Sequence, residues 1–310
     1  MSKILVTGGA GNIGTNLCSE LIKRGHNVIA CDITNNERES FIRVDVGKYR
    51  QIELALNKYG PFDFVYHLAA EYGRWNGEDY YENLWITNNV GTKNILTLQN
   101  IHKFKLIFFS SCEVYGDYNG LMTEDVMVDN KISDTYQMND YAITKWAGEL
   151  MCLNATAMTG NEIVRVRPLN CYGPHEHYTP YRGFIPKFIY QALKGDNITV
   201  HKGHKRIIDY VEDSCRTFAN ITENFIPGQV YNVGGKKEWE MNIEQYANIV
   251  IEATGGKKNQ INLVEPEKFT TVVKTVDFTN AIKDLDHNPI IDPIEGIKRT
   301  TKWMKETYKL

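Results

Sequence analysis

The chain has 310 residues, of which 42% are hydrophobic, and its formal net charge is −3 at pH 7. This length and composition allow a large buried core, organised as two domains or as one domain with an added lobe. The charge balance excludes the broad basic field that binders of nucleic acid or of membrane surfaces need, so we expect neither as a partner. An anionic substrate must then be held by a local group of cations.

The first residues and the cysteines favour a cytoplasmic protein. An apolar stretch begins directly after Lys3 and ends at a glycine turn, far short of a secretory signal or a membrane span. The six cysteines are scattered without zinc-like spacing, which favours reduced thiols. His175 and His177 alternate in a segment without other ligand residues at a recognised spacing. We therefore expect no metal site.

Short apolar runs alternate with helical patterns in the first half of the chain. The runs cover residues 4–7, 28–31, 64–68 and 106–110, and a further strand is predicted over 162–167. Alternation of this kind predicts an α/β fold with a doubly wound parallel sheet. The first four runs lack polar alternation because helices cover both faces of the sheet.

The pattern changes after Pro168. A Gly-, Pro- and Tyr-rich stretch over 172–183 is followed by a predicted helix near 185–194 and by short mixed elements. We interpret this part as a smaller C-terminal α/β lobe that binds the substrate. The predicted boundaries assign residues 1–168 and 207–235 to the larger domain and residues 169–206 and 236–310 to the lobe.

A glycine-rich turn links the first predicted strand to the first helix. Gly8, Gly11 and Gly14 give the spacing G-x-x-G-x-x-G, which lets a dinucleotide pyrophosphate approach bare backbone at a helix N-terminus. Asp32 ends the second strand, where a carboxylate accepts hydrogen bonds from ribose hydroxyls and repels a 2′-phosphate. The two features predict binding of NAD rather than NADP, although Asp is also a common turn residue at strand ends.

Tyr141 and Lys145 open a strongly helical segment and stand at i and i+4, on one helix face. A nearby ammonium group, together with a positively charged nicotinamide, stabilises a phenolate and makes it a usable base. The pair follows the segment Ser110–Gly116, which ends an apolar strand where α/β sheets place their ligands. The combination, and not the pair alone, indicates an active site.

Ordered landmarks over nearly the whole chain resemble the NAD-dependent nucleotide-sugar epimerase/dehydratase family of extended short-chain dehydrogenases/reductases. They are Gly8/Gly11/Gly14, Asp32, His67–Ala70, Asn88–Thr92, Ser110–Gly116, Tyr141/Lys145, Arg167–Pro174 and Arg206–Val211. The resemblance implies a Rossmann-type domain with a substrate lobe, tightly bound and recycled NAD, and a Ser111/Tyr141/Lys145 triad. It also implies a nucleotide-sugar substrate, with a UDP-sugar favoured, and a homodimer formed through a helix bundle.

We assign the binding residues on this basis. For the cofactor they are Gly8, Gly11, Asn12, Ile13, Gly14, Asp32, Asp45, Val46, Leu68, Ala69, Ala70, Asn88, Ser110, Tyr141, Lys145 and Pro168. For the substrate they are Glu71, Arg74, Asn170, Tyr178, Arg182, Lys187 and Arg206. The resemblance places Asn170 and Arg206 near the diphosphate, and a guanidinium suits this because it forms paired hydrogen bonds with phosphate. An ion pair is the alternative for Arg206.

The residues after the strand distinguish the branches of this family. In simple 4-epimerases the typical pattern has Thr at the position of Glu113. The pattern typical of the 4,6-dehydratases is Thr-Asp-Glu-Val-Tyr-Gly. That of the UDP-glucuronate decarboxylases is Thr-Ser-Glu-Val-Tyr-Gly. Cys112 stands where these patterns have Asp or Ser. The Cys-Glu pair and the aromatic segment 71–80 are similar to the tunicamycin-pathway UDP-N-acetylglucosamine 5,6-dehydratase branch. The segment 71–82 is either a wall or lid over the sugar or an ordered loop.

We accordingly predict an NAD-dependent nucleotide-sugar dehydratase/epimerase that transiently oxidises C4 of the sugar. Tyr141 takes the proton of the 4-hydroxyl, Glu113 removes the C5 proton, and Cys112 protonates the departing 6-oxygen. Structural roles stay open, with Cys112 as a packing residue and Glu113 as an ion-pair or substrate-orienting residue. The alternative activities are those of a 4-epimerase or a UDP-glucuronate decarboxylase. A non-catalytic NAD-sensing or interaction protein is disfavoured by the intact Tyr/Lys pair.

Overall fold

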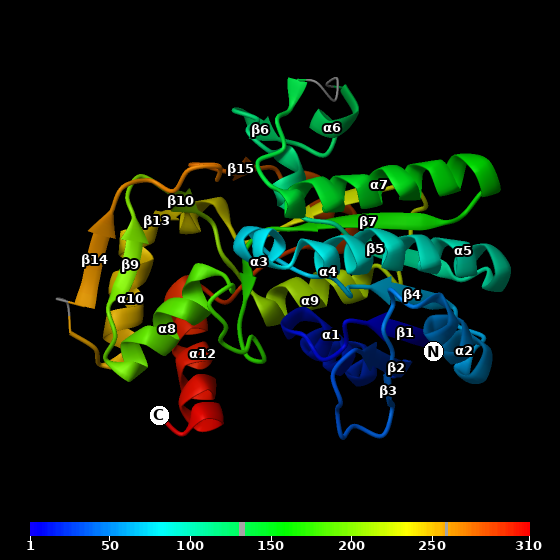
Figure 1. Ribbon diagram of the computed structural model, residues 1–310, viewed down its shortest axis with the longest axis horizontal. Coiled ribbons are helices and arrows are strands. Elements are labelled where there is room, and N and C mark those ends of the chain that lie inside the picture. The colour runs from blue at the N-terminus through cyan, green and yellow to red at the C-terminus, as the bar shows by residue number, and fades with distance from the viewer. Residues whose placement is uncertain (130–133, 258–259) are drawn as a thin grey trace.

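The computed structural model describes residues 1–129, 134–257 and 260–310 (Figure 1). Its centre is a seven-stranded sheet with the order β12-β7-β5-β4-β1-β2-β3, and every neighbouring pair is parallel. The strands are β1 (Lys3–Thr7), β2 (Asn27–Asp32), β3 (Phe41–Arg43), β4 (Phe64–His67), β5 (Lys105–Phe109), β7 (Ile163–Pro168) and β12 (Val230–Val233). The five predicted strands lie within one residue of their expected bounds. The predicted Rossmann-type, doubly wound parallel sheet is confirmed.

Helices cover both faces of this sheet. One face carries α1 (Asn12–Lys23) and α9 (Val211–Asn220), and the other carries α2 (Tyr49–Tyr59), α5 (Thr92–His102) and α7 (Asp140–Thr159). Within β1, Ile4 and Val6 join the first core and Leu5 joins the second. Successive side chains of a strand point to opposite faces, so an unbroken apolar run is what a strand between two helical layers needs.

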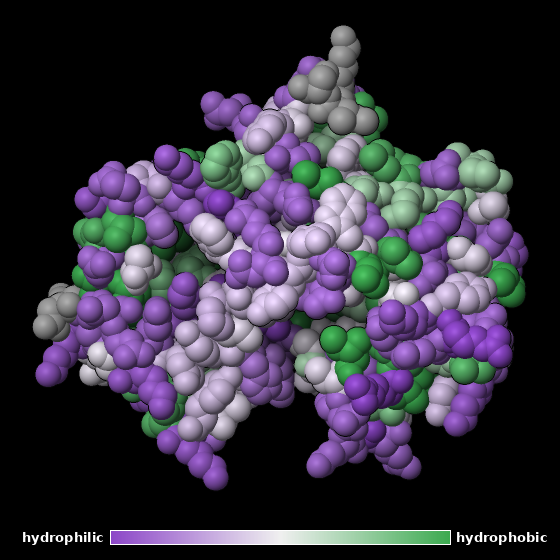
Figure 2. All heavy atoms as spheres, in the orientation of Figure 1, coloured by the Kyte–Doolittle hydropathy of each residue, from purple (hydrophilic) through white to green (hydrophobic). Residues whose placement is uncertain are grey.

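The smaller lobe has a separate apolar core. Its helices α8 (Phe184–Lys194), α10 (Ile243–Thr254) and α12 (Pro293–Tyr308) pack with the parallel strands β9 (Ile198–His201) and β14 (Ile261–Val264). The lobe lies at the left of the large sheet in Figure 1, and hydrophilic residues cover most of the face shown in Figure 2. The α/β lobe expected after Pro168 is therefore present, and its predicted first helix is α8.

The chain passes between the two parts more than once. α9 and β12, which lie inside the predicted segment 207–235, return to the large sheet. α11 (Thr279–Leu285) lies inside the range predicted for the lobe, yet its Ala281 and Leu285 pack into the core of the large sheet. The division of the chain into two domains at these boundaries stays a prediction.

Short elements complete the described chain. They are α3 (Arg74–Asp79), α4 (Tyr81–Trp85), the π-helix η1 (Ile86–Gly91), η2 (Cys112–Tyr115), β6 (Leu121–Met122), α6 (Val126–Asp129), β8 (Cys171–Tyr172), β10 (Lys205–Arg206), β11 (Asp209–Tyr210), η4 (Lys237–Trp239), β13 (Met241–Asn242) and β15 (Thr275–Val276). β15 pairs with β6, which brings a late part of the chain close to η2. Among the described residues, none of the helices combines the length and apolarity needed to cross a bilayer.

Candidate active site

The glycine turn is built so that side chains are excluded from it. Gly8 has φ of +71°, and a Cβ there would lie 2.7 Å from the backbone nitrogen of Ala69. A Cβ on Gly14 would lie 2.1 Å from the carbonyl oxygen of Gly8, whereas at Gly11 the nearest atom is 3.3 Å away. α1 begins after Gly11 without a side-chain cap and without an acidic residue in its first turn. Its N–H groups and its positive dipole end therefore suit the pyrophosphate of NAD.

Polar groups line the entrance to α1. Asn12 is buried, and its Oδ1 has no hydrogen-bond partner among the described residues, which leaves an acceptor for a ligand. Its Nδ2 lies 3.5 Å from Oε2 of Glu176, and burial raises the pKa of this carboxyl to about 7. Ile13 accepts a bond at its carbonyl oxygen from the thiol of Cys215, at 3.6 Å. Glu176 was not predicted as a site residue, because only the fold brings it to the turn.

Asp32 lies beside the same turn. Its carboxylate accepts hydrogen bonds from the N–H of Ala10 at 3.1 Å and of Thr34 at 3.3 Å, and the residue is half-buried. Arg38, which the sequence analysis missed, donates to the carbonyl oxygen of Gly9 at 2.7 Å and so braces the turn from the opposite side. The placement of Asp32 fits the predicted contact with a ribose, and it also serves the turn itself.

Further cofactor candidates stand at or just beyond the carboxyl ends of β3, β4 and β7. Leu68 and Ala69 donate their N–H groups to the carbonyl and the hydroxyl of Thr7, each at 3.2 Å, and Ala70 follows them. Asp45 accepts from the N–H of Gly47 at 2.8 Å, and buried Val46 accepts at its carbonyl from Asn94. Pro168 ends β7. The sheet thus places these residues along one edge, as expected for a ligand crevice.

Asn88 and Glu71 are joined by two hydrogen bonds. The side-chain amide of Asn88 accepts from the N–H of Glu71 at 2.9 Å and donates to its carbonyl at 3.1 Å. It also donates to Thr144 Oγ1 on α7 at 3.0 Å. The carboxylate of Glu71 accepts from Asn76 at 2.8 Å. These contacts order the start of the segment that follows β4.

The reactive pair lies at the start of α7, which Asn139 caps with its own side chain. The Nζ atom of Lys145 donates to the carbonyl of Phe109 at 2.8 Å and lies 5.9 Å from the ring centroid of Tyr141. The side chain of Ser111 lies close enough to Tyr141 to lower the pKa of its phenol. The structure therefore brings the three members of the predicted triad together at the end of β5.

Burial controls the ionisation of this pair. It raises the pKa of Tyr141 to about 12, with the charge of Glu113 adding to the rise and the Ser111 side chain opposing it. It lowers the pKa of Lys145 to about 8. Without a ligand the phenol keeps its proton, so a bound positive charge is needed to make Tyr141 a base at neutral pH.

Glu113 is paired with a lysine from the far end of the chain. Its Oε1 contacts the Nζ atom of Lys274, whose side chain is 2% exposed. Burial alone would raise the pKa of Glu113, but the charge and hydrogen bond of Lys274, with Arg206 nearby, hold it below its ordinary value. Lys274 was not predicted, and no local signal marks it in the sequence.

Cys112 points into a packed, largely apolar environment. It is 1% exposed, belongs to a cluster with Tyr115, Leu169 and Ile207, and its thiol donates to the carbonyl of Arg167 at 3.1 Å. Burial raises its pKa to about 12. This environment favours the packing role over the predicted acid role.

A buried ionic network lies behind the reactive pair. Ser110 donates its hydroxyl to Glu149 on α7 at 2.6 Å, and both oxygens of Glu149 accept from Arg167 at 2.8 Å. Arg165 reaches the same carboxylate at 3.3 Å. Ser110, predicted to contact the cofactor, thus ties the end of β5 to α7.

The predicted substrate residues fall into two groups. The guanidinium of Arg206 donates hydrogen bonds to the carbonyls of Lys205, Thr271 and Val272, at 2.6 to 2.8 Å. Asn170 has φ of +45° and donates to the carbonyl of Ile207 at 3.0 Å. Arg206 and Asn170 can bind a diphosphate only through the N–H groups that these backbone contacts do not use.

The other predicted substrate residues bridge the two parts of the molecule or lie within the lobe. Arg182 stacks over the ring of Tyr72 at 3.7 Å, and Tyr178 stacks on Tyr190 with 3.9 Å between ring centroids. Lys187 is half-buried on α8.

The segment after β4 touches the lobe directly. Arg74 contacts the carbonyl of Lys268 and lies between the rings of Trp75 and Phe269, while Trp75 donates to Glu267 at 2.8 Å. The segment predicted as a wall or lid therefore connects the large sheet domain with the lobe. Arg74 takes part in this connection through its contacts with Lys268 and Phe269.

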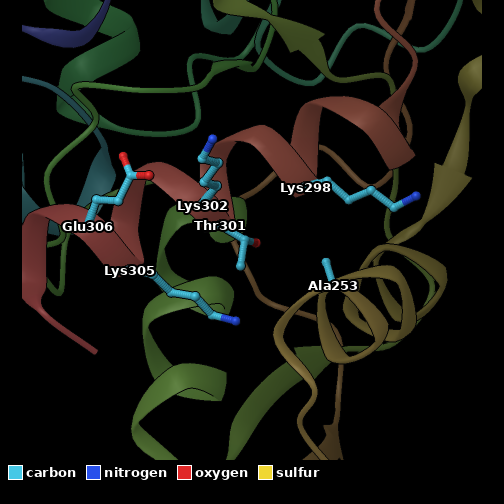
Figure 3. A pocket seen from close by; sticks show the side chains of 6 residues that line it. All are labelled: Ala253, Lys298, Thr301, Lys302, Lys305 and Glu306. Carbon is cyan, nitrogen blue, oxygen red and sulfur yellow. The ribbon is translucent and has the colours of Figure 1, made fainter.

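A cavity of about 400 Å³ lies elsewhere, between α10 and α12 (Figure 3). Its lining consists of Ala253, Lys298, Thr301, Lys302, Lys305 and Glu306, none of which belongs to the predicted site. Over residues 1–129, 134–257 and 260–310, no cluster of three or more His, Cys, Asp or Glu side chains could hold a metal ion.

The parallel sheet, the glycine turn at β1 and the Ser111/Tyr141/Lys145 group together define an enzyme of the short-chain dehydrogenase/reductase type. Residues 4–234 match the NAD dependent epimerase/dehydratase family. The chain belongs to this family, and its cofactor is NAD.

Relatives extend over the whole chain. A UDP-N-acetyl-alpha-D-glucosaminuronate decarboxylase of Bacillus cytotoxicus is 30% identical, with 98% of each chain covered. A UDP-glucuronate 4-epimerase of Thermodesulfobacterium geofontis is 29% identical, covering 100% of this chain and 98% of the relative. The solved structure of an epimerase from Methanothermobacter thermautotrophicus superposes with a TM-score of 0.87 at 25% identity, covering 99% of this chain and 93% of that one. The similarity to the tunicamycin-pathway branch stays a prediction.

Proposed function

We propose that this protein acts on a nucleotide-linked hexose, with a UDP-sugar favoured, and that it oxidises C4 of the sugar transiently. The observation that carries the proposal is the group formed by Tyr141, Lys145 and Ser111 at the end of β5. The relatives named for UDP-sugar decarboxylation and epimerisation support the substrate class.

The residues have distinct tasks in this reaction. Oη of Tyr141 takes the proton of the sugar 4-hydroxyl, the Ser111 hydroxyl orients that oxygen, and the Lys145 ammonium stabilises the phenolate. NAD, when bound, supplies the acceptor for the hydride that leaves C4 and gives the hydride back, so no external reductant is consumed. Gly8, Gly11 and Gly14 hold its pyrophosphate, and Asp32 its ribose.

The ketone at C4 acidifies the proton at C5. We propose Glu113 as the base that removes it, because its contact with Lys274 keeps the carboxylate ionised. In the dehydratase form of the reaction Cys112 would still have to protonate the 6-oxygen, and for this its thiol must leave the carbonyl of Arg167.

A second candidate is decarboxylation of a nucleotide-linked hexuronate. The environment of Cys112 favours it, because loss of carbon dioxide from a 4-keto sugar acid needs no acid at the 6-oxygen. The Bacillus cytotoxicus relative, named as a decarboxylase, points the same way.

NMR of reactions in deuterated water tests the proposal. The substrates are UDP-glucose, UDP-N-acetylglucosamine, UDP-glucuronate and the GDP- and CDP-linked counterparts. Loss of the 6-hydroxyl with exchange at C5 identifies a dehydratase, carbon dioxide release a decarboxylase, and inversion at C4 alone an epimerase. No change in any sugar, with NAD bound, would instead support an NAD-sensing protein.

In the same experiment, the variant Tyr141→Phe tests the role of Tyr141 as the base. Removing only the hydroxyl is expected to lower turnover by at least about 10²-fold, the ordinary contribution of a general base, while NAD stays bound. Full turnover of the variant would remove Tyr141 from the mechanism.

We also propose a homodimer and a cytoplasmic location. Apolar side chains stay exposed on neighbouring helices, with Ile143, Leu150, Leu153 and Met158 on α7 and Ile101 on α5. An apolar helix face of this kind suits a helix bundle with a second copy. All six cysteines are free, which fits a reducing compartment.

A further inference from the structure

Lys274 occupies an unusual position for a lysine. It lies in the lobe segment just before β15, yet its ammonium contacts Glu113, 161 residues earlier in the chain. Its side chain is 2% exposed, while that of Glu113 is 33% exposed. A buried ammonium is costly without a partner, so the contact with Glu113 is what makes this burial possible.

The backbone around Lys274 is held from several sides. Thr271 donates its hydroxyl to the carbonyl of Gly116 at 2.7 Å, directly after η2. Arg206 binds the carbonyl of Val272 at 2.8 Å, and β15 pairs with β6. These contacts come from both parts of the molecule, so the lysine is delivered to the site by the docking of the lobe.

Within the described parts of the chain, four ionisable groups lie near enough to influence Glu113. The phenol of Tyr141 and the thiol of Cys112 face it from α7 and η2, and the cations of Lys274 and Arg206 face it from the lobe. Tyr141 and Cys112 are neutral near pH 7, since burial raises the pKa of both to about 12. The charge state of Glu113 is therefore set by the two lobe cations, and Lys274 is the one in direct contact.

We propose that Lys274 is a positioning residue that holds Glu113 ionised and oriented beside Tyr141, so that the lobe completes the active site. The inference rests on the proposed function for the role of Glu113 as a base. The ionisation of Glu113 itself can be measured without any reaction, which keeps the two proposals separable.

The direct test is a ¹³C NMR titration of the glutamate carboxyl groups in the full-length protein with its NAD. Comparison with Glu113→Gln assigns the Glu113 signal. In Lys274→Met the pKa of Glu113 is expected to rise by about one unit or more, because the opposite charge is gone while burial remains. Lys274→Arg should restore the low value. Lys283→Met, on the exposed side of α11, is the matched control and should leave it unchanged.

The second test is the pH profile of deuterium incorporation at C5. Loss of Lys274 should move the acid limb to higher pH by the same amount as the NMR shift, and Lys274→Arg should move it back. If Lys274→Met does not fold, Lys274→Gln removes the same charge with a polar side chain.

The outcomes separate the proposals. An unchanged pKa of Glu113 in a folded Lys274→Met or Lys274→Gln protein overturns the inference. A raised pKa together with a matching shift of the C5 exchange profile supports it. A raised pKa without turnover of any nucleotide-sugar upholds the control of Glu113 by Lys274 and rejects the proposed function.

Discussion

At the scale of single residues, Lys145 is placed for its proposed role beside Tyr141 at the expense of stability. Its ammonium is buried against the carbonyl of Phe109, and burial lowers its pKa to about 8. A lysine whose pKa is lower in the folded chain than in the unfolded chain binds its proton less well after folding, so the charged form destabilises the fold. This cost is present at neutral pH and disappears as the pH rises from about 8 toward the unfolded value.

Replacement of Lys145 by Met is therefore expected to stabilise the protein and inactivate it. Relief of the buried charge outweighs the lost hydrogen bond, for a net gain of about 2 kcal/mol in the free energy of unfolding at pH 7. The gain should shrink between pH 8 and 10. Denaturant unfolding of both proteins at pH 7 and at pH 10 measures the gain in stability. A variant less stable than the unmodified protein at pH 7 would contradict the expectation.

At the scale of elements, one carboxylate in the middle of α7 links this helix to β7 and to the end of β5. Glu149 is fully buried and binds Ser110, Arg165 and Arg167. Burial would raise its pKa, but the two arginines hold it below the ordinary value. Its stabilising contribution is therefore present above the unfolded pKa and is lost as the pH falls below it.

Glu149→Gln is expected to cost about 3–5 kcal/mol of stability, because two buried guanidinium groups lose their anion. The denaturation midpoint at pH 7 measures the loss. Glu223→Gln is the matched control, since Glu223 is 60% exposed where it meets Arg24 and its ion pair is screened by water. The control should cost less than about 1 kcal/mol.

At the scale of the whole molecule, the lobe and the sheet domain meet through contacts from distant parts of the chain. Lys274 reaches Glu113, Trp75 reaches Glu267, and Tyr181 donates to Asp79 at 2.8 Å. These contacts surround the edge of the sheet where the reactive group lies. The proposed active site therefore depends on contacts between both parts of the molecule.

The proposed dimer is tested at this scale. Leu150→Glu combined with Leu153→Glu places two carboxylates on the exposed face of α7 and is expected to yield a monomer of 35.6 kDa by light scattering. The unmodified protein should have about twice that mass. Leu54→Glu, on the exposed side of α2, should leave the mass unchanged. An unmodified protein of 35.6 kDa would reject the dimer.

The amino-acid sequence by itself determined the features that depend on near neighbours in the chain. Apolar runs located β1, β2, β4 and β5, since a strand between two helical layers is apolar on both sides. The prediction over 162–167 located β7, although that strand buries Arg165 and Arg167 among its apolar residues. The spacing of Gly8, Gly11 and Gly14 located the turn, because positive φ at Gly8 and close backbone approach at Gly8 and Gly14 leave no room for a side chain there. The i, i+4 spacing placed Tyr141 and Lys145 on one helix face.

Only the tertiary structure decided the partners of these residues. The pairing of Glu113 with Lys274, the burial of Cys112 and the approach of Glu176 to Asn12 depend on packing between segments more than 50 residues apart. Two-residue strands such as β6 and β15 are too short to leave a periodic signal. The local sequence pattern indicates which face of a helix or strand is apolar. Which charges meet across the molecule is set by how the lobe docks on the sheet.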